Sequence, residues 1–388
     1  MINLELTKEL QQTKDFLHGV GKDLFRPIAR KYDVAEHEYP KELDVMKAAQ
    51  APKEKKEEKD KGKSSKPKTA NLMAVISTEE VCWGDLGLTL TIPGRGLGNA
   101  AIDAVGTEEQ KERFGGKWAA MAITEPEAGS DAFSLVTTAE LDGDEWVLNG
   151  EKIFVTAADR CELVIVWATI DKSAGREGIK SFVVEKGTPG FKLEYLEHKL
   201  GIRASDTGTF VLKDCRIPKD NLLGTAEVKK SGGFKGVAQT FDNTRPPVAA
   251  MSLGVARAAL EFTKEKMEES GIQFDYHKNP NNLSANEKEY YLMEANLEAM
   301  RLLIWRAAWM ADNGERNSLQ ASMCKAKSGK AGTLIAQKCC ELLGPLGFTQ
   351  KELPEKWMRD VKITDIFEGT GQIMHRNIAR QILGMTVK

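Results

Sequence analysis

The sequence predicts an α+β chain of three consecutive domains, because the period of its apolar residues changes twice. Residues 1–116 read as an N-terminal helical domain, 117–228 as an antiparallel β-barrel or β-sandwich, and 229–388 as a helical domain resembling a four-helix bundle. A chain of 388 residues is long enough for two or three domains that each bury a core.

The first domain is predicted from apolar residues that share one helical face, such as Leu10, Phe16 and Leu17. The segment 51–69 interrupts this domain with charged and small residues and contains no large apolar side chain. Because such a segment cannot offset its ordering entropy, we expect a mobile charged loop at the surface. Docking of a partner is the less favoured interpretation of this loop.

The middle domain is predicted from short β-type runs separated by turn dipeptides such as Gly143-Asp144 and Asn149-Gly150. These runs are 145–150, 152–156, 163–169, 181–184 and 209–212. Short, regularly punctuated strands are typical of an antiparallel barrel or sandwich. From about residue 235 the helical period returns, with long segments at 285–312 and 317–343.

Composition excludes several classes of function. The net charge of −2 provides no basic surface for nucleic acid, and no window approaches the roughly 18 to 20 apolar residues of a membrane span. The six cysteines show no zinc-type spacing, so we predict reduced, mostly buried thiols and no metal site. Because no signal or transit peptide is recognised, we expect a cytoplasmic, bacterial protein.

The run Ile366-Phe-Glu-Gly-Thr-Gly-Gln372 contains the most informative acid of the chain. Glu368 follows apolar residues, and Gly369 after it allows the main chain to approach a ligand closely. Burial would raise the pKa of this carboxyl, whereas the N-terminus of the helix that Thr370 is predicted to cap would lower it. Two interpretations stay open from this run alone: Glu368 is a general base, or it merely caps the next helix.

A second group of polar residues lies in the run Ala122-Ile-Thr-Glu-Pro-Glu-Ala-Gly-Ser-Asp131. The hydroxyls of Thr124 and Ser130, with the exposed amides of this run, suit the carbonyl edge of a flavin ring or a phosphate. The alternative is a plain loop at the entrance of the β domain, and Thr156 by itself reads as an ordinary strand threonine. The run Gly94-Arg-Gly-Leu-Gly98 lacks the spacing and the preceding strand of a dinucleotide-binding motif, so we do not predict nicotinamide binding.

In combination, these segments resemble the acyl-CoA dehydrogenase family. The run from Glu125 to Asp131 is similar to the family's first signature, and Phe367-Glu-Gly-Thr370 is similar to its catalytic E-G-T segment. Asp242-Asn-Thr-Arg-Pro246 is similar to its D-x-T-R-P helix start. The resemblance covers nearly the whole chain in the right order, and the family has the same helix–β–helix architecture.

The resemblance implies an FAD enzyme that oxidises an acyl-CoA thioester to the trans-2-enoyl-CoA. Glu368 matches the base that removes the proton α to the thioester carbonyl while the β-hydride passes to flavin N5. Some family members carry the base at the position that matches Thr244, where a threonine cannot do this work, so Glu368 is the remaining candidate. The backbone N–H of Glu368 and a flavin hydroxyl would stabilise the enolate-like oxygen.

The resemblance also implies which residues bind the cofactor and the substrate. Residues that match contacts to FAD are Thr124, Ser130, Phe154, Thr156, Gln273, Phe274, Glu341, Gly344, Thr370 and Gln372. Residues that match the surroundings of the acyl-CoA are Ser130, Asp242, Thr244, Arg245, Phe367 and Gly369.

Several positions depart from the family pattern. Phe154 stands where a tryptophan commonly stacks on the flavin, and Phe367 stands where a tyrosine usually precedes the base. The second signature has Glu341 in place of a glutamine, and Pro345 removes one N–H donor from it. The run Gly271-Ile-Gln-Phe-Asp275 lacks the arginine that grips FAD of a neighbouring subunit, which predicts weaker flavin binding or a different partner residue.

The leading prediction is therefore an acyl-CoA dehydrogenase that forms a homo-oligomer, a dimer or a tetramer, and passes electrons to an electron-transfer flavoprotein. One alternative keeps the fold and acts as a flavin oxidase or monooxygenase on a non-CoA substrate. Another alternative is a non-catalytic, poorly flavinated subunit of a hetero-oligomeric dehydrogenase, which the missing arginine favours. The sequence does not predict the length of the acyl chain.

Overall fold

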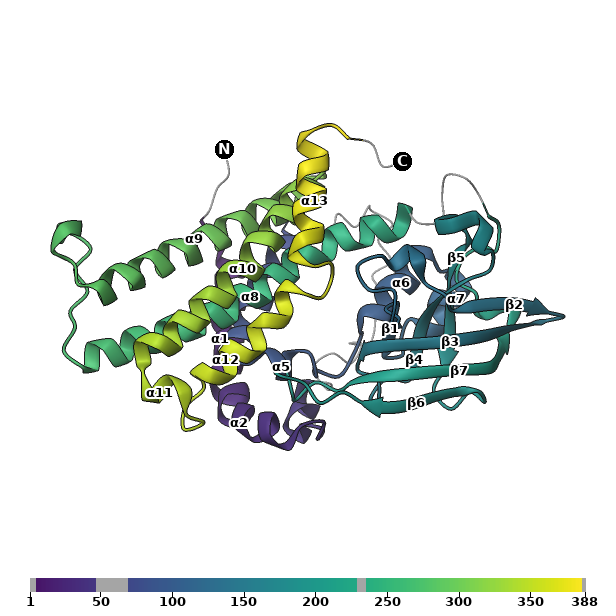
Figure 1. The fold of residues 1–388 in the computed structure, drawn as a ribbon, viewed down its shortest axis with the longest axis horizontal. Coiled ribbons are helices and arrows are strands. Elements are labelled where there is room, and N and C mark those ends of the chain that lie inside the picture. Colours follow the sequence, from purple (N-terminus) through teal and green to yellow (C-terminus); the bar gives the residue numbers. More distant parts are fainter. Residues whose placement is uncertain (1–4, 47–68, 229–234, 386–388) are drawn as a thin grey trace.

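The computed structural model describes residues 5–46, 69–228 and 235–385, and in the last of these ranges the side chains from Thr244 onward. Helices and strands are segregated, with a helical body on one side and a β domain on the other (Figure 1). The predicted fold class, helical, then β, then helical, is confirmed. Most of the loop predicted at 51–69 falls outside the described residues.

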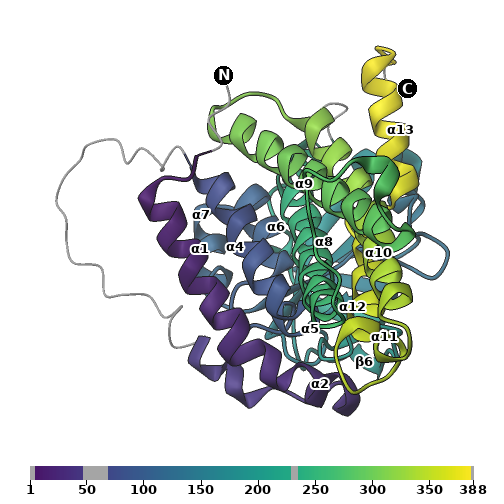
Figure 2. The same cartoon turned by 90° about the vertical axis from the view of Figure 1, so that its left-hand side faces the viewer.

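The N-terminal helices up to residue 89 pack into the core of the helical body, whereas the two helices at 97–105 and 108–114 pack against the β-sheet. Phe25 and Val75 belong to the same buried cluster as Leu253, Ile304 and Trp357 from the C-terminal helices. Figure 2 shows the long helices of both regions side by side. The N-terminal elements are α1 (Lys8–Val20), a π-helical turn (Gly21–Phe25), α2 (Arg26–Ala35), a 3-10 turn (Lys41–Leu43), α4 (Ala70–Gly84), α5 (Leu86–Thr89), α6 (Leu97–Val105) and α7 (Glu108–Phe114).

The described residues of the middle region form one seven-stranded sheet in the order β1-β4-β2-β3-β7-β6, with β5 paired to β4. The strands are β1 (Ala119–Ala122), β2 (Thr138–Asp142), β3 (Glu145–Thr156), β4 (Leu163–Thr169), β5 (Ile179–Glu185), β6 (Phe191–Leu196) and β7 (Thr207–Pro218). The sheet is mixed and not wholly antiparallel, because β1 and β2 both run parallel to β4. The expectation of a purely antiparallel domain was wrong at this edge, since a long connection, and not a hairpin, joins β1 to β4.

Strand β4 is buried along its whole length because both faces of the sheet are covered. Val164 and Val166 belong to one buried cluster, whereas Ile165 and Trp167 belong to another that includes Ile102 of α6. This alternation follows from the period of two in a strand. Helix α6 therefore joins the sheet to the rest of the chain on one face.

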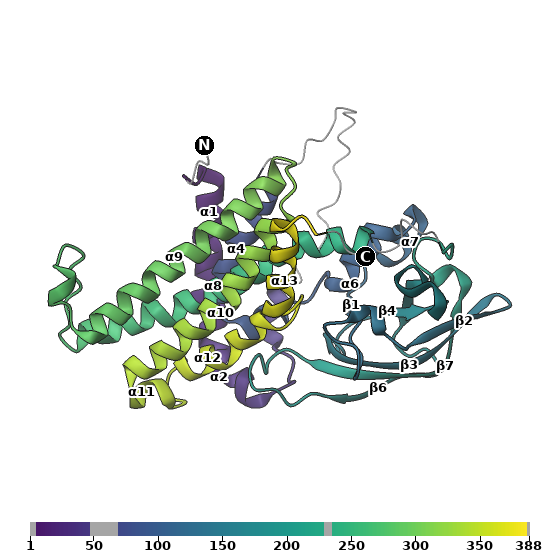
Figure 3. The ribbon, with the colours of Figure 1, turned by 45° about the horizontal axis from the view of Figure 1, so that its top comes forward.

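The C-terminal region consists of long antiparallel helices that contact one another. Its elements are α8 (Lys235–Glu269), a 3-10 turn (Pro280–Asn282), α9 (Ala285–Asp312), α10 (Ser318–Leu343), α11 (Pro345–Phe348), α12 (Pro354–Val361), a 3-10 turn (Lys362–Asp365) and α13 (Gly371–Ile382). Figure 3 shows the N-terminal end of α8 reaching from the helical body toward the β domain. This end of α8, with the segment before α13, brings the candidate site together.

The cysteines agree with the prediction made for them, because all six are buried and none forms a disulfide. Across the described ranges, no helix is both long enough and apolar enough to cross a membrane.

Candidate active site

Glu368 lies in a tight turn between the 3-10 turn at Lys362–Asp365 and helix α13. The turn is left-handed at two consecutive residues, with φ of +56° at Glu368 and +91° at Gly369. Thr370 is the N-cap of α13, since its hydroxyl accepts a hydrogen bond of 3.3 Å from the amide of Ile373. The prediction that Thr370 caps this helix is confirmed, and the alternative that Glu368 is only the cap was wrong.

The carboxylate of Glu368 is half-buried and contacts helix α8. The hydroxyl of Thr244 donates a hydrogen bond of 2.7 Å to one of its oxygens. Burial raises the pKa of Glu368, while the hydrogen bond from Thr244 and the positive charges of Arg245 and Lys325 oppose that rise. Burial thus raises the pKa of Glu368, as predicted. The opposing effect, which the sequence assigned to the N-terminus of the next helix, comes from Thr244, Arg245 and Lys325.

Lys325 of α10 is a site residue that the sequence did not reveal. Its side chain is fully buried, and its ammonium donates a hydrogen bond to the carbonyl of Gly369. Burial lowers the pKa of Lys325 to about 8, against the effects of Asp365 and Glu368. The signal that could have revealed it is a lysine on a helical face of small residues, namely Ala321, Ser322, Ser328 and Gly329.

Helix α8 supplies Thr244 and Arg245, and both side chains are half-buried. Two prolines, Pro246 and Pro247, follow them directly inside the helix and cannot donate backbone hydrogen bonds. Of the predicted substrate residues, Thr244 contacts Glu368, and Arg245 lies close enough to influence its pKa. The side chain of Asp242, predicted with them, lies outside the described side chains.

The loop that carries Thr124 and Ser130 is held in place by a buried ion pair. The ammonium of Lys152 lies 2.6 Å from the carboxylate of Glu125, and neither side chain is exposed by more than 1%. The same carboxylate accepts hydrogen bonds from the amide and the hydroxyl of Thr137. Glu125 therefore shapes this loop from within, a role that the sequence did not predict for it.

Phe154 lies on a β-bulge with its ring open to the surface. It has a φ of +58° at the register shift between Lys152 and Val155, and its side chain is 60% exposed. The amide of Ile153 donates a hydrogen bond of 2.9 Å to the carbonyl of Thr124. Thr124 therefore lies next to the strand segment that carries Phe154. An exposed aromatic ring, with Thr124 beside its strand and Thr156 two residues further along it, fits the flat apolar face and polar edge of a flavin.

Four predicted FAD residues lie elsewhere in the same chain. Phe274, which follows Gln273, packs against Tyr290 with ring centroids 4.5 Å apart, in the connection between α8 and α9. Glu341 forms an ion pair of 2.8 Å with Lys338, and Gly344 ends α10. Figure 1 shows the α8–α9 connection and the α10 terminus at the end of the bundle remote from the β domain. A single chain therefore does not bring these four residues to Phe154.

The remaining predicted residues lie next to Glu368 in sequence. Phe367 and Gly369 flank Glu368, and both are half-buried. Gln372 is exposed in the first turn of α13. Thus one chain gathers Thr244, Arg245, Phe367, Glu368 and Gly369, with the unpredicted Lys325 beneath them.

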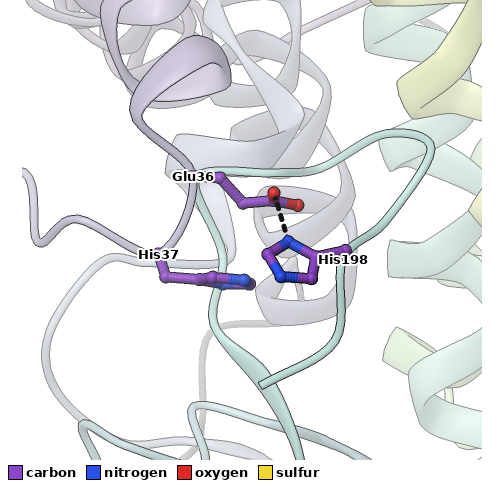
Figure 4. Close-up of side chains that lie close together, drawn as sticks. All are labelled: Glu36, His37 and His198. Atoms are coloured by element: carbon purple, nitrogen blue, oxygen red, sulfur yellow. Dashed lines mark hydrogen bonds and ion pairs between the residues drawn. The ribbon is translucent and has the colours of Figure 1, made fainter. Parts of the chain in front are cut away.

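A separate group of metal-ligand side chains, Glu36, His37 and His198, lies at the junction with the β domain (Figure 4). The ligand atoms of these residues all lie within 4.8 Å of one another. The Glu36 carboxylate is already engaged, however, by the ring of His198 at 2.9 Å and by the guanidinium of Arg203 at 3.2 Å. We therefore interpret this group as an ion-paired contact between two loops.

Comparisons with known proteins agree with this geometry. A family profile described as the acyl-CoA dehydrogenase middle domain matches residues 120–215, and one described as the C-terminal domain matches residues 231–383. The mitochondrial short-chain specific acyl-CoA dehydrogenase of Bos taurus is 35% identical over 98% of this chain and 90% of its own length.

Solved structures are similar over the whole chain. Butyryl-CoA dehydrogenase from Megasphaera elsdenii has a TM-score of 0.84 at 30% identity, covering 98% of this chain and 100% of that one. A chain in a structure described as the electron transferring flavoprotein of Acidaminococcus fermentans has a TM-score of 0.84 at 31% identity, with coverage of 98% and 100%. The resemblance noted in the sequence is confirmed, and the chain belongs to the acyl-CoA dehydrogenase family of FAD-dependent oxidoreductases.

Proposed function

We propose that this chain is a short-chain acyl-CoA dehydrogenase in which Glu368 removes the proton α to the thioester carbonyl. The observation that carries the proposal is the position of the Glu368 carboxylate, half-buried in a strained turn and bonded to Thr244. A carboxylate whose pKa is raised toward neutrality is a stronger base than an exposed one. Family membership supports acyl-CoA as the class of substrate.

The neighbours of Glu368 keep it ready to accept a proton. Burial raises the pKa of the Glu368 carboxyl, while Thr244, Arg245 and Lys325 favour its ionised form. These opposed effects suit a group that must be ionised before the reaction and protonated after it. Thr244 cannot act as the base itself, because an alcohol is far too weakly acidic to be ionised near neutral pH.

The residues of the β domain that fit FAD are Thr124, Phe154 and Thr156, with Ser130 on the same loop as Thr124. When bound, FAD supplies the acceptor for the hydride that leaves the β-carbon of the substrate. The chain's own part is to hold the flavin face against the acyl chain, to exclude water and to take up the α-proton at Glu368. The ion pair of Lys152 with Glu125 supports the flavin side of this arrangement by fixing the loop of Thr124.

The remote positions of Gln273, Phe274, Glu341 and Gly344 support a homo-oligomer. If these residues contact FAD as the resemblance implies, they do so on a neighbouring copy of the chain, because they lie at the end of the bundle remote from the β domain (Figure 1), and Phe154 belongs to β3 of that domain. A dimer or tetramer follows, and sedimentation with and without FAD tests it. A monomer that holds FAD at full occupancy would contradict this part of the proposal.

Named relatives support the substrate and the electron partner. A relative is named short-chain specific, and a similar structure is of a butyryl-CoA dehydrogenase, so we propose a straight short-chain acyl-CoA such as butyryl-CoA. The similar chain from Acidaminococcus fermentans comes from a structure described as an electron transferring flavoprotein, which supports that class of protein as the partner.

The test is anaerobic mixing of the FAD-loaded protein with butyryl-CoA while flavin absorbance is followed. We expect rapid bleaching of the wild type and retained flavin and ligand binding, but no bleaching, for Glu368→Gln. Glu140→Gln, an exposed change on β2, is the matched control and should bleach normally. Failure of any acyl-CoA to bleach the flavin would favour an oxidase, and failure to take up FAD would favour a structural subunit.

A further inference from the structure

Lys325 places a positive charge in the interior of the helical body, where an unpaired ammonium is costly. Lys152 and Lys356 are as deeply buried, and both form ion pairs with carboxylates, at 2.6 Å to Glu125 and 2.5 Å to Asp360. The ammonium of Lys325 is instead directed to a main-chain carbonyl, that of Gly369. Gly369 directly follows Glu368, so the buried ammonium contacts the turn that carries the proposed base.

The turn needs such an anchor because its backbone is strained. A glutamate with a φ of +56° occupies a region that residues with a β-carbon rarely adopt. One helical turn beyond Lys325, a β-carbon on Gly329 would lie 2.8 Å from the Cα of Asp365. Helix α10 therefore holds the turn at both ends, by close packing at Asp365 and by the ammonium at Gly369.

We propose that Lys325 is the positioning residue of the base: its hydrogen bond to the Gly369 carbonyl holds the left-handed turn that directs Glu368 toward Thr244 and the substrate. The role of Lys325 in catalysis rests on the proposed function, whereas its hydrogen bond to the turn follows from the structure alone. In this proposal Lys325 does not contact the substrate.

The charge of Lys325 adds a second effect on the same carboxylate. The charged groups that face this lysine are Glu368 and Asp365 from the turn and Arg245 from α8, and Asp365 also pairs with Lys362 at 3.2 Å. A nearby cation favours the ionised form of Glu368, so removing it should raise the pKa of Glu368 further. The acid limb of kcat/KM should then move to higher pH.

The experiment compares Lys325→Met, Lys325→Arg and the control Lys330→Met in the FAD-loaded protein. Lys330 lies on the same helix and is exposed, so the same chemical change is made away from the turn. For Lys325→Met we expect kcat with butyryl-CoA to fall on the order of 100-fold with a much smaller change in KM, and the acid limb to rise by about one pH unit. The amides of Phe367, Ile373 and Met374 form hydrogen bonds at the two ends of the turn. Their hydrogen exchange should accelerate in Lys325→Met, and Lys325→Arg should restore slow exchange and the acid limb.

Each result has a defined meaning. Unchanged exchange of these three amides in Lys325→Met, or an acid limb that stays in place, would overturn the proposal. An equal loss in Lys325→Arg and Lys325→Met would also overturn it, and Lys325→Gln, a smaller change, replaces the methionine variant if that variant does not fold. If the wild type fails to oxidise any acyl-CoA, the proposed function fails, and the exchange data still decide whether Lys325 holds the turn.

Discussion

The hydroxyl of Thr244 donates a hydrogen bond of 2.7 Å to the carboxylate of Glu368, joining positions 124 residues apart in sequence. The bond connects helix α8 to the turn before α13, two elements that approach each other only in the folded chain. It stabilises the ionised carboxylate and so opposes the rise in pKa that burial causes. The chemistry of Glu368 therefore depends on a residue that cannot itself act as a base.

Replacing Thr244 with valine removes the donor and nearly keeps the shape of the side chain. A hydrogen bond to a charged group is worth about 1.5 to 3 kcal/mol, so we expect the pKa of Glu368 to rise by about one unit or more. The acid limb of the pH profile of kcat/KM should move upward by that amount, since this profile reports the free enzyme.

Thr78→Val is the matched control for this substitution. Thr78 is a half-buried threonine of α4, as Thr244 is of α8, and its hydroxyl donates a hydrogen bond within its own helix, to the carbonyl of Ala74. Its pH profile should coincide with that of the wild type. An acid limb unchanged in Thr244→Val would mean that the hydroxyl does not influence the base.

The short distance between the side chains of Thr244 and Glu368 also predicts that a carboxylate at position 244 can replace the one at position 368 as the base. Thr244→Glu combined with Glu368→Gly places a carboxylate on α8 close to the position that the present carboxylate occupies. Glycine suits position 368, because φ there is +56° and a residue without a β-carbon adopts this conformation freely.

We expect Glu368→Gly alone to lose nearly all bleaching of the flavin by butyryl-CoA, and the double variant to recover at least about tenfold. Single-turnover absorbance measurements distinguish this from a change in product release. Flavin content and ligand binding, measured in both variants, show whether the active site is otherwise intact. No recovery in the double variant would indicate that α8 cannot direct a carboxylate at the α-carbon.

The helices were predicted more completely than the strands, for local reasons. The predicted segment 285–312 coincides with α9, which begins with a capping box at Ser284 and Glu287. The run at 317–343 agrees with α10, which ends at Gly344. Strand β1 was not predicted, because Ala-Ala-Met-Ala lacks the β-branched and aromatic residues of a strand and depends on its pairing with β4.

The site was predicted only where its residues form contiguous motifs. Glu368 and Thr370 stand in one short run, and Thr244 stands in another that the resemblance identified. Lys325 lies 44 residues from Gly369, inside a helix where a lysine is ordinarily solvated, and the small residues on its helical face are the one local sign of its burial. Long-range packing decides that burial, so it emerged only from the folded chain.

The ion pair of Glu125 and Lys152 predicts a strong effect of Glu125→Gln on the β domain. Breaking a buried pair leaves an uncompensated charge and costs about 3 to 5 kcal/mol. We expect a large loss of thermal stability and weaker retention of FAD, measured by flavin release on heating. Glu127→Gln, an exposed change two residues away in the same loop, should alter neither quantity.

The loss of thermal stability in Glu125→Gln should depend on pH in a definite direction. Burial acts to raise the pKa of Glu125, but the hydrogen bond from Lys152 holds that pKa below its ordinary value of 4.5. A carboxyl with a lowered pKa contributes stability that is present above that value and is lost as the pH falls. The difference in Tm between wild type and Glu125→Gln should therefore be full at neutral pH and narrow below about pH 4.5, and a constant difference down to pH 3 would contradict the role of the ion pair.

The turn itself is tested by Gly369→Ala with Gly314→Ala as its control. Both glycines have positive φ, +91° and +71°, so a β-carbon at either should cost about 1 to 3 kcal/mol of stability. A β-carbon at Gly314 meets nothing within 4 Å, whereas one at Gly369 lies 2.7 Å from the end of the Met374 side chain. Gly369 alone adjoins the base and accepts the bond from Lys325.

We therefore expect similar losses of Tm in the two variants but very different activities. Gly314→Ala should keep kcat near that of the wild type, and Gly369→Ala should lose on the order of 100-fold, because a small displacement of the base has a large effect on proton transfer. Calorimetry and steady-state kinetics on the same preparations make the comparison. Equal kcat values would mean that the strained turn is a feature of the fold without consequence for Glu368.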